Sequence, residues 1–243
     1  MSGDYYSEYI TSRRPHGRTR GLVSRWHSRM FNRAMRDARF TRKIRVLEIG
    51  AGHGQFAEYV TSMGHEYNFV DLSPAVARDM HAKGFVGVCA DVEDAPESMN
   101  EFDIVWLSHV LEHCETPSQA TSLIRNAAKR CSRAGFIVVV SPDATSFKRE
   151  FFASDWSHGY PTFRRNVAQI MNEVGLNLYK SRFHRGGRFF WLTRAPFAVL
   201  AKVPTFAVDV LLSRRRVAAG EGYFYSWKTL LGWRQIYIMA AKS

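Results

Sequence analysis

Residues 46–56 read VLEIGAGHGQF, and most of what the sequence says about the fold depends on them. An apolar run leads into glycines at every second position, Gly50, Gly52 and Gly54, and a helix-like segment follows. Continuous apolar residues are typical of a strand buried on both faces. Glycines let the backbone turn sharply and approach a ligand closely. A strand, a glycine turn and a helix in this order form a nucleotide-binding corner, with the ligand at the carboxyl end of the strand.

The glycine spacing bears on which nucleotide fits. A dinucleotide site has the pattern Gly-x-Gly-x-x-Gly, and Gln55 stands where its third glycine would be. The pattern present is Glu-x-Gly-x-Gly-x-Gly, beginning at Glu48. The turn therefore departs from the fingerprint of a pyridine dinucleotide site.

Length and composition indicate a protein of ordinary globular size. The 243 residues, 46% of them hydrophobic, suit one domain or one domain with an appended lobe. The first 40 residues are polar and arginine-rich, so no signal peptide is predicted. The chain has only three scattered cysteines, which favours neither a disulfide framework nor a zinc cluster. We therefore expect a cytoplasmic protein.

Positive charge is concentrated at the two ends of the chain. Residues 1–45 carry a net charge of +9, residues 46–180 carry −6, and residues 181–243 carry +9. Basic flanks favour an anionic partner, such as a phosphorylated substrate, a lipid headgroup at a membrane surface or a nucleic acid. A solvated surface that keeps the protein soluble explains them equally well.

The N-terminal flank divides into an arm and a helix. Residues 1–20 mix tyrosines with arginines and resemble a poorly ordered arm that could close over a site. A helix is predicted over residues 22–40, since its apolar residues recur at helical spacing: Leu22, Trp26, Met30, Phe31, Ala34, Met35 and Ala38. Arginines fall between them, so we expect the helix to pack on a sheet or cap a site. Membrane or RNA contact through its arginine face is the alternative.

Strands and helices alternate through the middle of the chain. Strands are predicted at residues 44–49, 67–71, 85–90, 102–108, 136–142, 176–183 and 233–240, and helices at 75–83, 116–133 and 162–174, the last capped by Thr162. The alternation predicts an α/β fold with a doubly wound, mostly parallel sheet. The strand at 136–142 is the most apolar, so we expect it at the centre.

Acidic residues end the second and third predicted strands. Asp71 lies 21 residues past Gly50, where an acid in such sheets accepts hydrogen bonds from ribose hydroxyls. Asp91, with Val92 beside it, could receive the amino group of adenine, although a lone acid there is more often a plain turn residue. Ser73 and Pro74 suit the start of the next helix.

The segment after the fourth strand is rich in histidine. His109, Glu112 and His113 match the His-x-x-Glu-His pattern of one metalloprotease group. We reject that interpretation because the motif follows a buried strand and no third ligand is evident. The sequence therefore predicts no metal site.

Residues 184–232 form a long segment before the last strand. Its apolar centre holds three charges and two prolines, so a bilayer-spanning helix is not expected. Apolar surface beside the arginines at 214–216 would suit an interfacial membrane segment. We prefer a lid over the mouth of the site.

Residues 42–183 resemble the class I S-adenosylmethionine-dependent methyltransferases. The similar motifs are the glycine turn, the Asp-x-Ser-Pro sequence at 71–74, His-Val-Leu-Glu-His at 109–113, Asp-Trp-Ser-His at 155–158 and Glu-Val-Gly-Leu at 173–176. The resemblance implies a Rossmann-like, seven-stranded sheet whose last strand, within 233–243, runs antiparallel. The basic arm and the segment 184–232 are not covered by the resemblance, and such enzymes usually choose their substrates in these parts. We expect residues 1–41 to form an N-terminal cap and 184–232 an insertion or lid.

The resemblance further implies S-adenosylmethionine as cofactor and assigns residues to its parts. Those at the amino-acid portion are Glu48, Gly50, Ala51, Gly52 and Gly54; those at the adenosine are Asp71, Leu72, Asp91 and Val92; and those at the methionine end are Ser108 and His109. Ser-Pro-Asp at 141–143 does not support methylation of amides in DNA or protein. The acids of metal-dependent catechol enzymes are also missing.

The predicted activity is methyl transfer to an oxygen or nitrogen of a small-molecule acceptor, such as a sugar, a lipid-linked intermediate or a secondary metabolite. A hydroxyl acceptor needs a base, and histidine titrates near neutral pH. His158 is the first candidate and His113 the second. The alternatives are methylation of RNA, motivated by the basic flanks, and a protein of this fold that binds the cofactor without methyl transfer or uses it for a rearrangement.

Overall fold

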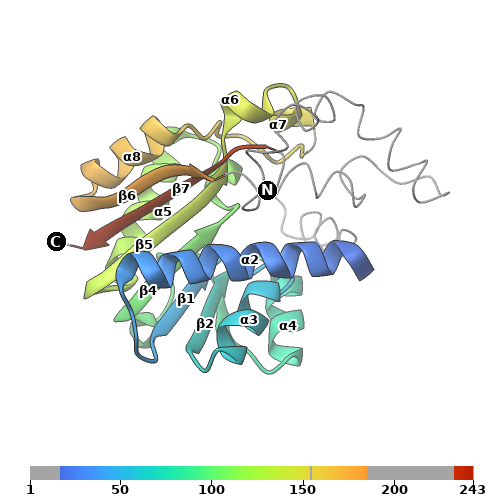
Figure 1. Cartoon of the computed structure of the whole chain (residues 1–243), viewed down its shortest axis with the longest axis vertical. Coiled ribbons are helices and arrows are strands. Elements are labelled where there is room, and N and C mark those ends of the chain that lie inside the picture. The colour runs from blue at the N-terminus through green and yellow to red at the C-terminus, as the bar shows by residue number, and fades with distance from the viewer. Residues whose placement is uncertain (1–16, 154, 185–232, 243) are drawn as a thin grey trace.

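A seven-stranded mixed sheet forms the centre of the molecule (Figure 1). The computed structural model describes residues 17–153, 155–184 and 233–242. The strands are β1 (Arg45–Ile49), β2 (Glu66–Asp71), β3 (Val86–Cys89), β4 (Phe102–Ser108), β5 (Cys131–Pro142), β6 (Leu176–His184) and β7 (Gln235–Lys242). Their order is β3-β2-β1-β4-β5-β7-β6, with β7 antiparallel to both neighbours. The predicted fold class is confirmed.

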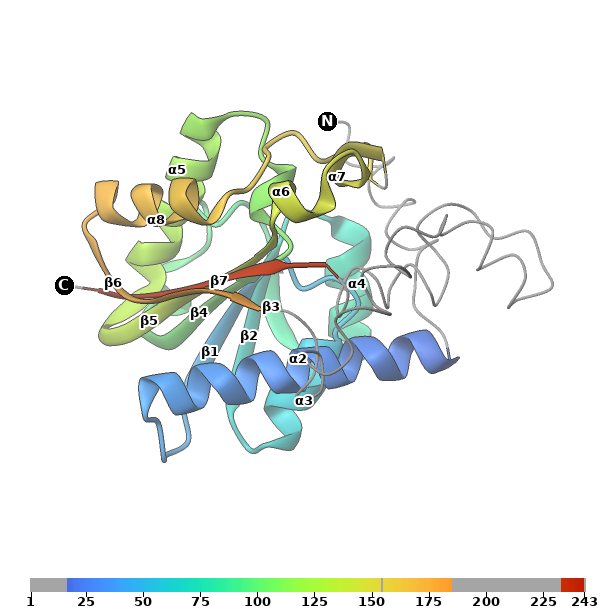
Figure 2. The ribbon, with the colours of Figure 1, turned by 45° about the horizontal axis from the view of Figure 1, so that its top comes forward.

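Helices cover both faces of the sheet (Figure 2). They are α2 (Gly17–Ala38), α3 (Gln55–Ser62), α4 (Pro74–Ala82), α5 (Pro117–Arg130), α6 (Ala144–Phe147), α7 (Glu150–Ala153) and α8 (Arg164–Glu173), with 3₁₀ turns η1 (Glu97–Met99) and η2 (Leu111–His113). Helices α5 and α8 lie on one face, and α2 and α3 lie on the other. Each face has its own apolar core.

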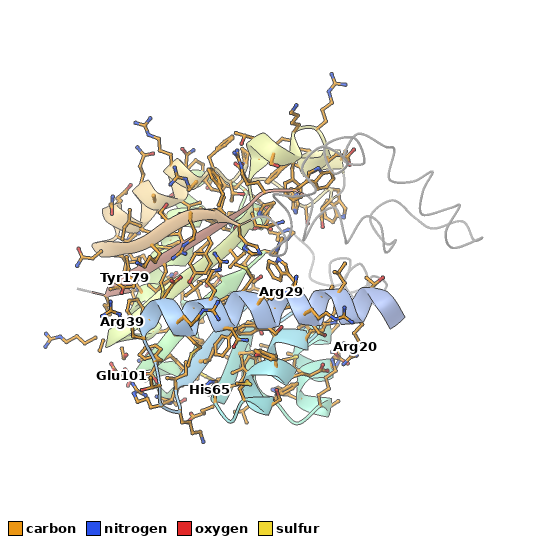
Figure 3. The ribbon with its side chains drawn as sticks, in the orientation of Figure 1. Arg20, Arg29, Arg39, His65, Glu101 and Tyr179 are labelled. Atoms are coloured by element: carbon orange, nitrogen blue, oxygen red, sulfur yellow. The ribbon has the colours of Figure 1, made fainter. Side chains whose placement is uncertain are left out.

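Helix α2 is amphipathic, as predicted. Trp26, Met30 and Phe31 are buried against the sheet, in one core with β1 and β4. Figure 3 marks Arg20 and Arg29 along the helix. The described part of α2 thus packs on the sheet. The helix begins at Gly17, so residues 17–20 are helical and not part of an arm, as was predicted for 1–20. The rest of the predicted arm, residues 1–16, and all of the predicted insertion except His184 lie outside the described residues.

The strand register gathers the predicted site residues at one edge. Ile49 of β1 lies beside Val70 of β2 and Leu107 of β4 in parallel pairing. The next residues along these strands are Gly50, Asp71 and Ser108. All three therefore meet at the carboxyl edge, where ligands bind in open α/β sheets.

Two strand predictions need correction. Strand β4, rather than the strand at 136–142, lies in the middle of the sheet, and β5 is its neighbour. Helix α5 ends at Arg130, and β5 begins at once at Cys131, five residues earlier than predicted. Cys131 pairs with Phe102 across a bulge in the ladder. This pairing explains why the strand extends beyond its apolar run.

The predicted cap of the helix at 162–174 is also wrong. Thr162 is fully buried, and its hydroxyl donates a hydrogen bond to the carbonyl oxygen of Pro142 at 2.5 Å. The helix begins at Arg164 after Phe163, which supplies no side-chain cap. Thr162 instead fastens the loop to the end of β5. By contrast, Ser73 caps α4 as predicted, with its hydroxyl accepting from the amide of Val76.

Candidate functional site

The glycine turn is closely packed at Gly50 and Gly54 and open at Gly52, which lies between them. Gly50, Gly52 and Gly54 have φ angles of +79°, +53° and +81°, which side chains rarely adopt. A Cβ at Gly50 would lie 2.6 Å from Cγ2 of Val110, and one at Gly54 would lie 2.9 Å from Sδ of Met80. At Gly52 no atom would lie within 4 Å. The turn therefore offers bare backbone to a ligand at Gly52.

Asp71 holds the glycine turn to the end of β2. Its Oδ2 accepts a hydrogen bond from the amide of Ala51 at 2.9 Å, and its Oδ1 accepts one from the amide of Ser73 at 2.8 Å. Burial raises the pKa of Asp71, while bonds from the backbone amides of Ser73, Ala51 and Gly52 oppose that shift. A carboxylate has about four acceptor sites, so acceptor capacity remains beyond these three amides. Contact with a ribose therefore stays a prediction alongside this structural role.

Glu48 has a partner inside the protein. The hydroxyl of Tyr67 donates to Oε2 of Glu48 at 2.5 Å, and both side chains are buried. Burial raises the pKa of Glu48 well above its ordinary value, against the opposing effect of that hydrogen bond. The structure thus places Glu48 against β2. Its predicted contact with the cofactor remains a prediction.

The residues predicted near adenine differ in exposure. Leu72 is 69% exposed. Asp91 is exposed, and its Oδ1 accepts from the amide of Glu93 at 2.9 Å, as in a plain turn. Val92 is buried, and its carbonyl accepts from the guanidinium of Arg130. An apolar surface for a ring is present at Leu72, and the adenine role of Asp91 stays a prediction.

Buried polar atoms gather where β4 ends. The hydroxyl of Ser108 and Nε2 of His109 are buried and have no hydrogen-bond partner among the described residues. The rings of His109 and Trp26 lie 5.5 Å apart. Within the same described part of the chain, Nε1 of Trp26 and Nε2 of Gln55 are buried donors without an acceptor. Buried donors are rarely left unpaired in folded proteins. These atoms suit a polar ligand.

Sequence reasoning missed three members of this group. Trp26 counted only as an apolar residue of the helix, and Gln55 only as a departure from the dinucleotide pattern. His27 joins them: burial, with the nearby His109, lowers its pKa to about 3, so it is neutral at pH 7. The sequence did hold a signal for them: Trp26 and His27 are consecutive aromatic residues with polar ring atoms, on the apolar side of an amphipathic helix.

Glu112 lies next to His109. It is fully buried, its Oε1 lies 3.1 Å from Nδ1 of His109, and its Oε2 accepts from the hydroxyl of Ser141 at 3.2 Å. Burial alone would raise the pKa of Glu112, but the neighbouring histidines lower it below its ordinary value. The buried side chain is therefore a carboxylate at neutral pH.

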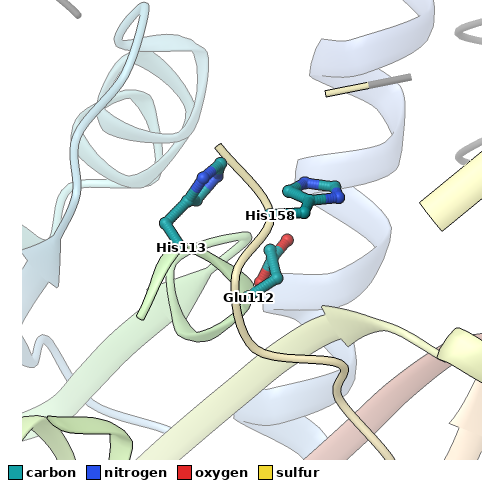
Figure 4. Close-up of side chains that lie close together, drawn as sticks. All are labelled: Glu112, His113 and His158. Carbon is teal, nitrogen blue, oxygen red and sulfur yellow. The ribbon is translucent and has the colours of Figure 1, made fainter. Parts of the chain in front are cut away.

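The two predicted bases, His158 and His113, lie together (Figure 4). Their ring centroids are 5.0 Å apart, although 45 residues separate them in the sequence. Nδ1 of His113 lies 2.9 Å from the hydroxyl of Ser157, and Nδ1 of His158 lies 2.5 Å from the carbonyl oxygen of Phe151. Burial lowers the pKa of His113, so its imidazole is neutral at pH 7. The fold thus builds a histidine pair beside Glu112.

Both the sheet and its carboxyl edge define an α/β protein of the methyltransferase class. Residues 16–181 match the family model described as "Methyltransferase domain", and the chain belongs to this family. The predicted class is confirmed, as is its cofactor, S-adenosylmethionine.

Among residues 17–153, 155–184 and 233–242, no helix has both the length and the apolar character that a membrane crossing needs.

One curated relative is a methyltransferase by name. Malonyl-[acyl-carrier protein] O-methyltransferase of Herminiimonas arsenicoxydans is 34% identical over 98 residues, which cover 40% of this chain and 37% of that protein. The chain spans less than two fifths of the length of the curated relatives it matches.

Solved structures share the fold. A SAM-dependent methyltransferase from Archaeoglobus fulgidus is similar with a TM-score of 0.61 and 24% identity, over 91% of this chain and 93% of that one. N-methyltransferase NodS from Bradyrhizobium japonicum, in complex with S-adenosyl-L-homocysteine, has a TM-score of 0.56 and 16% identity, over 89% and 85%.

The residues present fit S-adenosylmethionine. The open backbone at Gly52 admits a ligand, and the exposed Leu72 offers an apolar surface at the same edge. Trp26, Gln55 and Ser108 supply buried polar atoms that lack partners among the described residues and match a charged amino-acid group. The cofactor would thus lie along the carboxyl edge from β2 to β4.

Proposed function

We propose that the protein transfers the methyl group of S-adenosylmethionine to an oxygen of a small-molecule acceptor. One observation supports this proposal: the glycine turn and the histidine pair both lie at the carboxyl edge of the sheet and are linked by intervening polar residues. The open glycine turn and its unpartnered polar atoms lead through His109 and Glu112 to the pair His113 and His158. This arrangement supports a cofactor site next to a proton-accepting site.

When bound, the cofactor supplies a methyl group already activated as a sulfonium. The protein has mainly to hold the acceptor in line and exclude water, which accounts for up to about 7–11 kcal/mol of acceleration. The glycine turn and Asp71 fix the backbone beneath the cofactor. Trp26 and Ser108 would orient its amino-acid end.

A hydroxyl acceptor must lose its proton, and His158 is the candidate that takes it. Its Nδ1 faces a carbonyl oxygen, which can only accept, so Nδ1 carries the ring proton and Nε2 has the lone pair. His113 beside it is the second candidate. The curated relative carries out O-methylation by name, which supports oxygen over nitrogen as the acceptor atom.

The test is methyl transfer from labelled S-adenosylmethionine to a panel of hydroxyl, carboxylic acid and amine acceptors, read as a mass gain of one methyl group. The proposal expects an oxygen acceptor and a loss of turnover of about 100-fold or more in His158→Ala. Unchanged turnover and an unchanged pH profile in that variant would remove His158 as the base. RNA that gains methyl groups, with binding that weakens steeply as salt rises, would favour the alternative.

A further inference from the structure

The side chains of Glu112, His113 and His158 converge from two segments of the chain (Figure 4). Glu112 and His113 belong to η2, and His158 belongs to the loop after α7. One oxygen or nitrogen atom from each lies within 4.8 Å of the others. Two imidazoles and a carboxylate are a set of ligands that proteins use for zinc and other transition metals.

Hydrogen bonds fix both imidazoles in the form that a metal requires. The Ser157 hydroxyl donates its only proton to Oδ1 of Asp155 at 2.6 Å, so it accepts from Nδ1 of His113. Nδ1 of His158 donates to the carbonyl oxygen of Phe151. These bonds place the proton of each ring on Nδ1, so Nε2 is the nitrogen of each that can bind a metal. Ligating histidines usually donate their other ring N–H to such acceptors.

The carboxylate also lacks a conventional counterion. Glu112 is fully buried, and among the described residues its polar contacts are His109 and the hydroxyl of Ser141. No lysine or arginine of the described ranges pairs with it. A buried carboxylate is costly unless it is paired or coordinates a metal. His109 supplies a positive charge only when it is protonated, whereas a divalent cation beside Glu112 would supply it in either state of that histidine.

We propose that Glu112, His113 and His158 bind a divalent transition-metal ion, of which zinc is the probe. Ligands of tetrahedral zinc stand roughly 3.3 Å apart at bond lengths of about 2.0–2.1 Å, so side-chain rotation must close part of the 4.8 Å separation. Ser141, Ser157 and the Phe151 carbonyl form the surrounding hydrogen-bonded shell. Sequence reasoning expected no metal because no third ligand was evident; the fold brings His158 to that place.

Three protein ligands leave a coordination position open for an oxygen. The use of that position rests on the proposed function: a hydroxyl or carboxylate of the acceptor would bind the ion beside the cofactor. In this form of the reaction Nε2 of each histidine binds the ion, so His158 is a ligand and not the base. The ion would lower the pKa of a bound acceptor hydroxyl, whose proton leaves to solvent water. The acceptor class then narrows to molecules with a metal-binding oxygen.

The test is a titration of the full chain, free of any histidine tag and treated with chelator, with zinc alone. Calorimetry is expected to show one ion per chain, and cobalt is expected to give a visible spectrum of tetrahedral or five-coordinate type. Glu112→Gln and His158→Gln should each weaken binding at least about 100-fold. His81→Gln, an exposed histidine on α4, is the matched control and should bind as the parent does.

Two results would overturn the proposal: no stoichiometric binding to the parent chain, or equal affinity in the parent and His158→Gln. Thermal melting of each variant checks that it is folded, and His113→Gln replaces any variant that is not. A separate titration with S-adenosylmethionine keeps the hypotheses apart. Cofactor binding without metal leaves the proposed function intact, whereas metal binding without cofactor removes that function and keeps the metal site.

Discussion

Oδ2 of Asp71 accepts a hydrogen bond from the backbone amide of Ala51 at 2.9 Å, which joins the end of β2 to the glycine turn after β1. The acid predicted to hold a ribose thus also holds the turn that lies under the ligand. We therefore expect Asp71 to couple folding to cofactor binding.

Replacing Asp71 with Asn should weaken both properties. The amide group would present N–H to a backbone N–H, leaving a buried donor unpaired at a cost of about 1–3 kcal/mol in the free energy of unfolding. We expect S-adenosylmethionine affinity to fall about tenfold or more. Chemical denaturation and calorimetry measure the two effects. Asp94→Asn, at an exposed position, should change neither; an unaltered Asp71→Asn would contradict the coupling.

Gly52→Ala should separate binding from folding. The left-handed backbone costs an alanine about 1–2 kcal/mol, but its Cβ meets no protein atom within 4 Å. The methyl group would occupy space assigned to the cofactor, so affinity should fall at least about tenfold. Gly64→Ala is the matched control, since Gly64 also has a positive φ of +79° and open surroundings. If both variants bind alike, the open backbone at Gly52 is not part of the site.

Trp26→Phe tests the unpartnered donors. Phenylalanine keeps most of the apolar packing of α2 and removes Nε1, so stability should change little. Loss of a hydrogen bond to a charged group costs about 1.5–3 kcal/mol, which corresponds to a roughly 10- to 100-fold weaker affinity for the cofactor. Trp106→Phe removes a similar buried N–H from the middle of β4 and should leave affinity unchanged. Equal affinities in the two variants would contradict the assignment.

His184 should make stability depend on pH. Burial, with Arg33 and Arg29 nearby, lowers its pKa from 6.5 to about 4. Below pH 6.5 the unfolded chain therefore binds a proton that the folded protein refuses, and stability present above that pH is lost as pH falls toward 4. Denaturant unfolding at pH 6.5 and 5 should differ by roughly 2 kcal/mol more in the parent than in His184→Gln. Equal pH dependence would show that this histidine is not responsible.

Local signals predicted the sheet because each strand is encoded by its own neighbours. The apolar run before Gly50 indicated the first strand by itself. Ser73 and Pro74, directly before α4, indicated the start of that helix. The antiparallel last strand came from resemblance and agrees with the pairing of β7. Cys131 and Thr162 were misjudged because their partners, Phe102 and Pro142, are distant in the sequence.

The site was predictable in part for the same reason. Glycine spacing identified the turn, since the required backbone angles are a local property. The meeting of His158 with His113 depends on how the loop after α7 returns to η2, which no periodicity reports. Trp26 was interpreted by its apolar ring alone, and only the fold shows that its N–H is buried without a partner among the described residues.

The central claim is that the carboxyl edge from Gly50 to His109 binds S-adenosylmethionine. Calorimetric titration of the full chain with S-adenosylmethionine, and separately with a pyridine dinucleotide, tests it most directly. We expect one S-adenosylmethionine per chain with a dissociation constant of about 1 μM to 1 mM, the range in which Michaelis constants of enzymes usually fall, and no dinucleotide binding. A folded protein that ignores S-adenosylmethionine, or prefers the dinucleotide, would contradict the account.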